Sequence, residues 1–475
     1  MSVRFLLDGE TVEIADVDPT ATLLDHLRYT MRRTGTKEGC AEGDCGACTV
    51  LVGDLDGDAI AWRAVNACIL FLPMLHGRAL LTVESLAPAG ALNPLQACMA
   101  ANGSSQCGFC TPGFVMSLYG RCVGASGHDL PVADIVAGNL CRCTGYGPIL
   151  AAGDAVGPLE RDDSATVTAL KALADAPGAS GQHGERRWFA PRSCAALADL
   201  LTEYPDARMV AGATDVGLWV TKGLRSIDTL IFLGDIAELR AIEEGPAGVR
   251  LGAGVRYADA HGAFARLHPD LGELTRRIGG LQVRNAGTVG GNIANGSPIG
   301  DGPPAFIALG AELTLRSRDG RRTMALEDYF LDYGKQDRRP WEFLESLWIP
   351  RPGPDATIHI AKVSRRFDSD ISAVCGAFNL TVRNEIIAAA RIAFGGMAAT
   401  PRRAPLCEAA LVDQPFTLAT MERAADALRT DYAPLCDVRG SAAYRLDVAA
   451  NLLPRLWHRA QGQTVSVLDL DVAHG

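Results

Sequence analysis

Polar and apolar residues alternate over residues 3–7 and again over residues 10–14, on either side of the turn Asp8-Gly9. This pattern predicts a β-hairpin with a tight turn. Apolar residues at helical spacing follow in residues 23–27, after Thr20 or Thr22 as the helix cap. Further strands are predicted at residues 49–52 and 79–83. Together these elements predict a small mixed sheet at the start of the chain.

The apolar spacing changes to the helical period between residues 93 and 156. Helices are predicted at residues 95–99, 114–121, 132–140 and from 149 onward. Residues 174–184 are small residues, Pro, Gly and polar residues with little to bury, which predicts a linker. Beyond it, short apolar strands mix with helices and glycine-rich loops, and the fold class expected for the whole chain is multidomain α+β.

Composition narrows the class of protein. The chain has 475 residues, 48% of them apolar and 21% charged, which indicates a globular protein of several domains. The formal net charge of −10 argues against nucleic acid as the main partner. Neither a signal peptide nor an apolar run long enough for a membrane span is found, so we expect a cytoplasmic protein with no membrane partner. Cysteines in that compartment stay reduced and more often bind metal than form disulfides.

Four early cysteines have the spacing C-x4-C-x2-C-x19-C: Cys40, Cys45, Cys48 and Cys68. Plant-type [2Fe–2S] ferredoxins use C-x4-C-x2-C followed by a distant fourth cysteine for their cluster ligands. Gly39, Gly43 and Gly46 would let backbone N–H groups turn toward the sulfurs, some of them through positive φ. A zinc site with four cysteine ligands and a set of inert buried cysteines are the two alternatives.

A second set has the spacing C-x2-C-x30-C-x-C: Cys107, Cys110, Cys141 and Cys143. Each pair falls at a boundary between predicted helices, where free N–H groups favour a thiolate. Cys98 and Cys122 are interpreted as small buried apolar residues. No role is assigned to the later cysteines, Cys194, Cys375, Cys407 and Cys436.

Two glycine-rich turns, at residues 208–215 and 287–293, could cradle a pyrophosphate with their backbone N–H groups. The side chains of Thr214, Thr288 and Asn292 would add hydrogen bonds. Ordinary loop turns are the alternative. The chain has no G-x-G-x-x-G fingerprint at a strand-to-helix junction, no P-loop and no H-E-x-x-H, and no catalytic residue is predicted.

The strings QCGFCTPG at residues 106–113 and CRCTGY at residues 141–146, together with the ferredoxin-type loop, resemble the iron–sulfur region of the molybdenum hydroxylases. The resemblance implies that both cysteine sets hold [2Fe–2S] clusters. VAGATD, RNAGTVGGNI and SPIGD resemble the FAD-binding segments of the same family. By that match the residues expected to contact or lie near FAD are Arg208, Met209, Val210, Ala211, Gly212, Ala213, Thr214, Asp215, Ile278, Thr288, Gly291, Asn292, Asp301, Leu344 and Lys362.

Two further features of the flavin region affect these expectations. Some relatives place an aromatic residue where this chain has Ile278, so stacking on FAD is not expected there. Residues 364–370 resemble a loop beside the flavin that influences access by NAD, with a solvated charged loop as the alternative.

The resemblance implies four domains, a linker and a tail. The first two domains are a ferredoxin-like [2Fe–2S] domain of β-grasp type at 1–85 and a helical [2Fe–2S] domain at 86–158. After a linker at 159–185 come a two-part FAD-binding domain at 186–350, a flavoprotein C-terminal domain at 351–462 and a tail at 463–475.

The function implied is an electron relay from a molybdenum cofactor through two clusters and FAD to NAD. The chain is too short to include the family's large molybdopterin domain, so that cofactor is expected on a partner subunit, in an α2β2 heterotetramer. Fusion of the iron–sulfur part to the FAD part favours the xanthine-oxidising members that bacteria divide into two chains. The alternatives are another molybdenum hydroxylase, a stand-alone electron-transfer flavoprotein, and a zinc-stabilised scaffold with no redox role.

Overall fold

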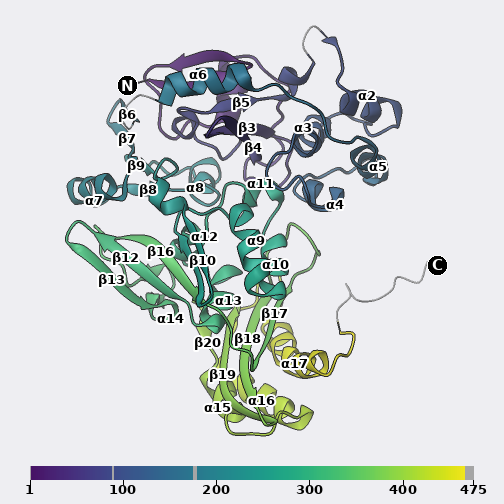
Figure 1. The fold of residues 1–475 in the computed structure, drawn as a ribbon, viewed down its shortest axis with the longest axis vertical. Coiled ribbons are helices and arrows are strands. Elements are labelled where there is room, and N and C mark those ends of the chain that lie inside the picture. Colours follow the sequence, from purple (N-terminus) through teal and green to yellow (C-terminus); the bar gives the residue numbers. More distant parts are fainter. Residues whose placement is uncertain (1, 88–89, 175–178, 466–475) are drawn as a thin grey trace. The chain divides into compact units, whose positions relative to one another are not determined.

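The computed structural model of the chain describes residues 2–87, 90–174 and 179–465. They divide into two compact units. Figure 1 labels the helices and strands of the chain. Unit 1 comprises Met1–Arg240, Gly254–Ala260 and Arg277–Gly291, and unit 2 comprises Ala241–Ala253, His261–Arg276 and Asn292–Gly475. The α+β class expected from the sequence is confirmed, with mixed and antiparallel sheets and packed helices.

Unit 1 begins with a five-stranded sheet of order β2-β1-β5-β3-β4. Its strands are β1 (Val3–Leu7), β2 (Glu10–Ile14), β3 (Thr49–Asp56), β4 (Ala59–Asn66) and β5 (Ala79–Leu81), with the short helices α1 (Leu23–Asp25), η1 (His26–Thr30), η2 (Leu72–Leu75) and η3 (Val83–Leu86) between them. β1 pairs antiparallel with β2 and parallel with β5, so the predicted hairpin and mixed sheet are confirmed. β4 was not predicted. It pairs with β3 along its whole length through the turn at Gly57, which has φ of +57°.

Four helices follow, as the apolar spacing predicts: α2 (Pro94–Ala101), α3 (Thr111–Cys122), α4 (Val132–Val136) and α5 (Gly147–Ala155). They share a core with the first sheet, in which Leu51 and Phe114 are fully buried. α4 is shorter than the predicted 132–140, because Gly138 and Asn139 leave the helix. Asn139 instead bonds to other parts of unit 1.

The linker predicted at 159–185 is wrong over most of its length. It contains α6 (Ser164–Ala174), which packs on the first sheet with Leu170 buried, and Asp163 accepts a hydrogen bond of 2.7 Å from the Trp62 indole. It also contains β6 (Ala179–His183), which pairs antiparallel with β7. Strand pairing uses backbone groups, so a segment of small and polar residues can form an edge strand without an apolar face. Residues 175–178 of the predicted linker lie outside the described residues.

A second sheet of unit 1 has the order β6-β7-β9-β8. The elements of this part are β7 (Arg186–Ala190), α7 (Cys194–Glu203), β8 (Arg208–Val210), α8 (Val216–Thr221), β9 (Thr229–Phe232), η5 (Ala237–Arg240) and α11 (Leu281–Arg284). Buried Trp188 and Phe232 of this sheet belong to the same apolar cluster as Phe71 of the first sheet region, and the rings of Phe71 and Phe232 meet edge to face at 6.5 Å. The ferredoxin-like region and the first part of the predicted FAD-binding domain therefore share one core.

Unit 2 has a five-stranded antiparallel sheet of order β10-β11-β16-β12-β13 and a four-stranded antiparallel sheet of order β17-β18-β19-β20. The first sheet and its neighbours are β10 (Ile242–Gly245), β11 (Gly248–Gly252), α10 (Pro269–Arg276), α13 (Gly302–Leu309), β12 (Glu312–Ser317), β13 (Gly320–Ala325), α14 (Leu326–Tyr329), β14 (Phe330–Asp332), β15 (Lys335–Gln336) and β16 (Phe343–Pro350). The second sheet and its helices are β17 (Ala356–Val363), β18 (Val374–Arg383), β19 (Ile386–Gly395), β20 (Arg402–Arg403), α15 (Pro405–Leu411), α16 (Leu418–Asp431) and α17 (Ala442–Ala460). The residues of α9 (Tyr257–Leu267) and α12 (Val289–Asn295) are divided between the two units.

An ionic cluster inside unit 2 joins α10, β17 and α17. Both carboxylate oxygens of Asp270 accept hydrogen bonds of 2.6 Å from Arg459, and one of them also accepts from the amide of Ile360 at 3.0 Å. His359 Nδ1 lies 3.2 Å from the same carboxylate. Burial alone would raise the pKa of Asp270, but its bonds to His359, Arg459 and Ile360 hold that pKa well below its usual range.

Asp270→Asn is expected to lower the stability of unit 2 by about 3 kcal/mol at neutral pH, because it removes the negative charge that Arg459 faces. Since the pKa of the carboxyl is depressed in the folded state, its stabilisation is present above the unfolded-state value near 4 and is lost as the pH falls further. The difference between wild type and variant should thus be constant from neutral pH to about 5 and shrink below about 4. Urea unfolding followed by hydrogen exchange in β17 measures it, with exposed Asp328→Asn as the control.

Candidate functional site

The first cysteine set lies in the loop between η1 and β3, and its fourth member follows β4. Hydrogen bonds link the thiol of Cys40 to those of Cys45 and Cys68, and Cys68 in turn to Cys48. These contacts lower the pKa of Cys40 and Cys48 and raise that of Cys45 and Cys68. The sequence therefore brings all four sulfurs of this set together.

Backbone N–H groups and glycines surround these sulfurs. The amide of Cys45 donates to Cys40 Sγ at 3.3 Å. Gly43 and Gly46 have φ of +79° and +70°, as predicted, and a Cβ on Gly39 would lie 2.8 Å from Cys45 Sγ. At residue 39 the loop can pass this close to Cys45 Sγ only because Gly39 carries no side chain.

The second set is arranged as two pairs. Cys107 and Cys143 share a hydrogen bond, and so do Cys110 and Cys141. Burial, followed by the contact with Cys141, raises the pKa of Cys110 to about 12. Burial opposes ionisation of Cys141, but the hydroxyl and amide of Thr144, at 3.1 and 3.5 Å from its sulfur, lower its pKa. Cys107 and Cys143 are exposed.

Pairs of cysteines are the arrangement that a two-iron cluster needs, because each iron takes two protein ligands. Within the described ranges, no three His, Cys, Asp or Glu side chains converge as they would on one metal ion. The donor chemistry of both sets, four thiols with nearby N–H groups, fits a [2Fe–2S] cluster at each.

The remaining cysteines lie outside both sets. Cys122 is buried, as predicted, but Cys98 is only partly buried. Of the four without an assigned role, Cys194, Cys375 and Cys407 are buried and Cys436 is exposed.

The two glycine-rich turns expected at the flavin meet inside unit 1. A Cβ on Gly212 would overlap the carbonyl of Ala286 and lie 2.9 Å from the amide of Gly287. Ala213 has φ of +58°, and the turn leads directly into α8, for which Asp215 is the N-cap. The Thr288 hydroxyl accepts from the Gly291 amide at 3.0 Å and keeps its own hydrogen for another acceptor. The backbones of the two turns thus lie side by side, and the Thr288 hydroxyl can still donate, which fits a group with acceptor oxygens such as a pyrophosphate.

Not every residue of the first flavin segment faces that turn. The guanidinium of Arg208 lies 4.8 Å from the centre of the Trp219 ring, and that of Arg225 lies 5.2 Å from it. Ile278 lies partly buried between α10 and α11. Burial raises the pKa of Asp215 above its usual range.

The other residues expected near FAD, Asn292, Asp301, Leu344 and Lys362, belong to unit 2. Asp301 and Lys362 form a buried ion pair of 2.5 Å, and Ser372 Oγ donates to the second carboxylate oxygen, also at 2.5 Å. Leu344 is buried in β16, on the other sheet of this unit. Asp301 and Lys362 therefore contact each other directly, whereas Leu344 lies on the other sheet of unit 2.

The loop 364–370, which the sequence places beside the flavin, is anchored within unit 2. The amide of Arg366 donates to Asp370 at 2.8 Å. The guanidinium of Arg276 in α10 lies 5.5 Å from the centre of the Phe367 ring.

Four family models match successive stretches of the chain. Residues 5–72 match the 2Fe-2S iron-sulfur cluster binding domain, residues 82–154 the [2Fe-2S] binding domain, residues 181–352 the FAD binding domain in molybdopterin dehydrogenase, and residues 359–460 the CO dehydrogenase flavoprotein C-terminal domain.

Individual proteins are similar over long stretches. Xanthine dehydrogenase of Drosophila pseudoobscura pseudoobscura is 32% identical over 94% of this chain, and the match spans 38% of the relative's length. The crystal structure of a Cu,Mo-CO dehydrogenase in its cyanide-inactivated form contains a chain that is 30% identical, with a TM-score of 0.55. The match covers 58% of this chain and 98% of that one. The chain belongs to the molybdenum hydroxylase family. Within that family it is an iron–sulfur and FAD unit, with two [2Fe–2S]-binding domains and an FAD-binding domain.

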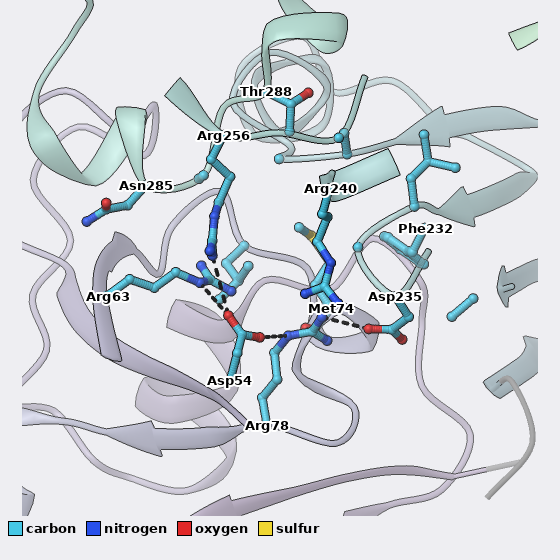
Figure 2. Close-up of a pocket in the computed structure, with 18 of the residues that line it drawn as sticks. Asp54, Arg63, Met74, Arg78, Phe232, Asp235, Arg240, Arg256, Asn285 and Thr288 are labelled. Atoms are coloured by element: carbon cyan, nitrogen blue, oxygen red, sulfur yellow. Dashed lines mark hydrogen bonds and ion pairs between the residues drawn. The ribbon is translucent and has the colours of Figure 1, made fainter. Parts of the chain in front are cut away.

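The structure also contains a charged cavity in this molybdenum hydroxylase unit that the sequence did not predict (Figure 2). The cavity has a volume of about 70 Å³, lies within unit 1 and is lined in part by Gly212 and Thr288 of the two flavin turns. Figure 2 shows three arginines converging on the carboxylate of Asp54: Arg63 at 2.9 Å, Arg78 at 2.7 Å and Arg256 at 3.4 Å. Arg78 also pairs with Asp235 at 2.7 Å.

The carboxylate of Asp54 is the centre of this cluster. Burial would raise the pKa of Asp54, but the three arginines hold it well below its usual range. Arg256 lies more than 170 residues from the others in sequence, so the cluster ties a segment next to the second flavin turn to the first sheet. No local motif could reveal it.

The buried pair of unit 2 gives a prediction for FAD binding by this molybdenum hydroxylase unit. Lys362→Met is expected to lower both FAD content and stability, the latter by about 3 kcal/mol, because it leaves the buried Asp301 carboxylate without its ammonium partner. FAD absorbance per chain and thermal unfolding measure the two effects. Lys335→Met, at an exposed position of the same unit, is the control and should change neither.

In the part of the chain that the structure describes, no helix has the length and apolar character of a membrane span.

Proposed function

We propose that the chain is the electron-transfer subunit of a xanthine dehydrogenase, which oxidises hypoxanthine and xanthine to urate. In this proposal it accepts electrons from a molybdenum cofactor on a large molybdopterin-binding partner subunit and delivers them to NAD. When bound, each [2Fe–2S] cluster carries single electrons and FAD couples them to two-electron hydride chemistry. The eight cysteines would hold the clusters, and the residues named above would hold FAD.

One observation carries the proposal. The helix α8 begins directly after Asp215, where the first flavin turn ends, and its last residue, Thr221, donates a hydrogen bond of 2.7 Å to the carbonyl of Ala41 in the first cysteine loop. Lys222 and Glu42 add an ion pair of 3.8 Å. A single helix of six residues therefore connects the expected flavin turn to the expected cluster loop within one unit, as a relay requires.

The comparisons support the choice of enzyme and the partner. The xanthine dehydrogenase relatives match this chain from its iron–sulfur region through its flavoprotein region. Nearly all of the CO dehydrogenase chain, 98%, matches 58% of this chain, so that chain corresponds to only part of this one. We expect an α2β2 assembly in the cytoplasm.

The test is to purify the chain with its native partner and to assay purine-dependent NAD reduction together with iron, molybdenum and FAD content. Iron, FAD and molybdenum in the complex with NADH formation on xanthine are the expected result. Reduction of oxygen in place of NAD would revise the acceptor. Activity on a different heterocycle would make the chain a unit of another molybdenum hydroxylase.

Two other outcomes would remove the proposal. Recovery without any molybdopterin-containing chain would favour a stand-alone electron-transfer flavoprotein. Zinc in place of iron, with no visible absorbance, would indicate a scaffold.

Cys107→Ser is expected to stop xanthine from bleaching the flavin absorbance while NADH still bleaches it, because only the molybdenum side of the relay is interrupted. Cys436→Ser, at an exposed cysteine outside both sets, is the matched control and should respond to both reductants. Normal bleaching by xanthine in Cys107→Ser would contradict the proposed order.

A further inference from the structure

A buried polar network joins three separate stretches of unit 1, with Gln282 of α11 at its centre. Gln282 Nε2 donates to Asn139 Oδ1 at 2.9 Å and lies 3.1 Å from both the Thr49 and the Ser117 hydroxyl oxygens. An amide nitrogen has two hydrogens, so these three acceptors share them. All four side chains are at most 2% exposed. The network thus lies in the interior, where the ferredoxin-like, helical and FAD-binding segments meet.

The backbones of the same three segments cross at glycines. A Cβ on Gly46 would lie 2.9 Å from the Cα of Asn139, and a Cβ on Gly138 would lie 3.0 Å from the Cα of Gly280. Each segment contributes one glycine, and none of the three could carry a side chain without moving a neighbouring backbone. The relative position of the segments is therefore set within narrow limits at this point.

Asn139 connects Gln282 to the loops of both cysteine sets. Its Nδ2 donates to the carbonyl of Gly46 at 3.1 Å. The next residue, Leu140, donates its amide to the carbonyl of Cys45 at 2.9 Å. Since Cys141 follows Leu140, one hydrogen bond connects a cysteine of the first set to the residue that precedes a cysteine of the second.

We propose that Gln282 is a positioning residue for the relay between the two cysteine sets, because it holds Asn139 against Gly46 and so fixes the Cys45–Leu140 hydrogen bond. The proposal rests on the proposed function, in which both sets carry clusters. Electronic coupling between redox centres falls less steeply along covalent and hydrogen bonds than across gaps. A residue that sets the geometry of a hydrogen bond between the two loops therefore influences exchange between the centres without touching either.

A buried amide can also serve packing alone, and the same segment offers an example. Asn285 is fully buried, its Nδ2 donates to the carbonyl of Ala64 at 3.0 Å, and it contacts neither cysteine loop through a hydrogen bond. Like Gln282, it has a side-chain oxygen with no hydrogen-bond partner among the described residues. Asn285 is thus the matched control for Gln282.

The first measurement is the hydrogen-exchange rate of the Leu140 amide in the full chain. Gln282→Met keeps the length of the side chain and removes its donors. We expect Leu140 to exchange about tenfold faster or more, which corresponds to a loss of about 1.4 kcal/mol in local stability. Asn285→Met should leave Leu140 close to the wild-type rate.

A second variant keeps the test valid if Gln282→Met fails to fold. Asn139→Asp retains the oxygen that accepts from Gln282 and removes the nitrogen that donates to Gly46. It is expected to speed Leu140 exchange as Gln282→Met does. Wild-type exchange in both variants would overturn the proposal.

The second measurement is the magnetic interaction between the two reduced clusters, seen by electron paramagnetic resonance of the iron-loaded chain. Gln282→Met should change this interaction and Asn285→Met should not. Faster Leu140 exchange with an unchanged interaction would overturn the proposal, because the bond would then matter for packing alone. Failure of the proposed function is seen separately, as a wild-type chain that takes up no iron, and it would remove both proposals.

Discussion

Gly46→Ala is expected to destabilise unit 1 by about 3 kcal/mol or more and to reduce iron uptake at both cysteine sets. Gly46 has φ of +70°, which alanine adopts only at a cost, and its new Cβ would overlap the carbonyl of Gly138. Because the overlapping atom is a backbone carbonyl oxygen, it cannot move away by a rotamer change as a flexible side chain would. Urea unfolding and iron content after reconstitution measure the two effects.

Gly57→Ala separates the cost of the backbone angle from the cost of the overlap. Gly57 also has positive φ, +57°, but nothing lies within 4 Å of the Cβ that alanine would add there. We expect it to lose only the conformational part, about 1 kcal/mol, with normal iron content. Equal losses of unfolding free energy in the two variants would mean that the overlap with the Gly138 carbonyl adds nothing to the cost of Gly46→Ala.

Asp54→Asn is expected to cost about 3–5 kcal/mol, because it leaves Arg63, Arg78 and Arg256 gathered around a neutral amide. The side chains of Asp54, Arg63 and Arg78 are at most 16% exposed, so water cannot replace the lost charge. The loss should appear in the urea unfolding of unit 1. It should also persist at high salt, which screens buried charges weakly.

Asp56→Asn is the control for Asp54→Asn. It lies two residues further along β3 and is exposed. A surface substitution of this kind changes stability by about 0.5 kcal/mol or less. Similar losses of stability in the two variants would show that the ion pairs around Asp54 contribute no more to the stability of unit 1 than an exposed carboxylate does.

The cysteine sets could be predicted because their spacing is local. Within each loop the cysteines lie a few residues apart, and the glycines between them predict the positive φ values that Gly43 and Gly46 have. The hairpin of β1 and β2 and the helices α2, α3 and α5 could also be predicted, because their apolar residues follow the period of a strand or a helix.

Features that depend on distant partners could not be predicted. Arg256 reaches Asp54, and Gln282 reaches Asn139, across more than a hundred residues, and neither has a local pattern that differs from an ordinary polar surface. The segment of α6 was misread for a related reason. Its Leu170 is buried against the first sheet, which only the folded chain brings near.

Unit 1 is built from three separate stretches of the chain, and their order has a consequence for synthesis of the protein. Its last segment, Arg277–Gly291, carries Gln282 and follows all eight cysteines of the two sets, the last of which is Cys143. On a ribosome, these cysteines emerge before the segment that carries Gln282. The hydrogen bond from Gln282 to Asn139 therefore cannot form until that segment has been made, so unit 1 is completed only after residue 291 has been synthesised.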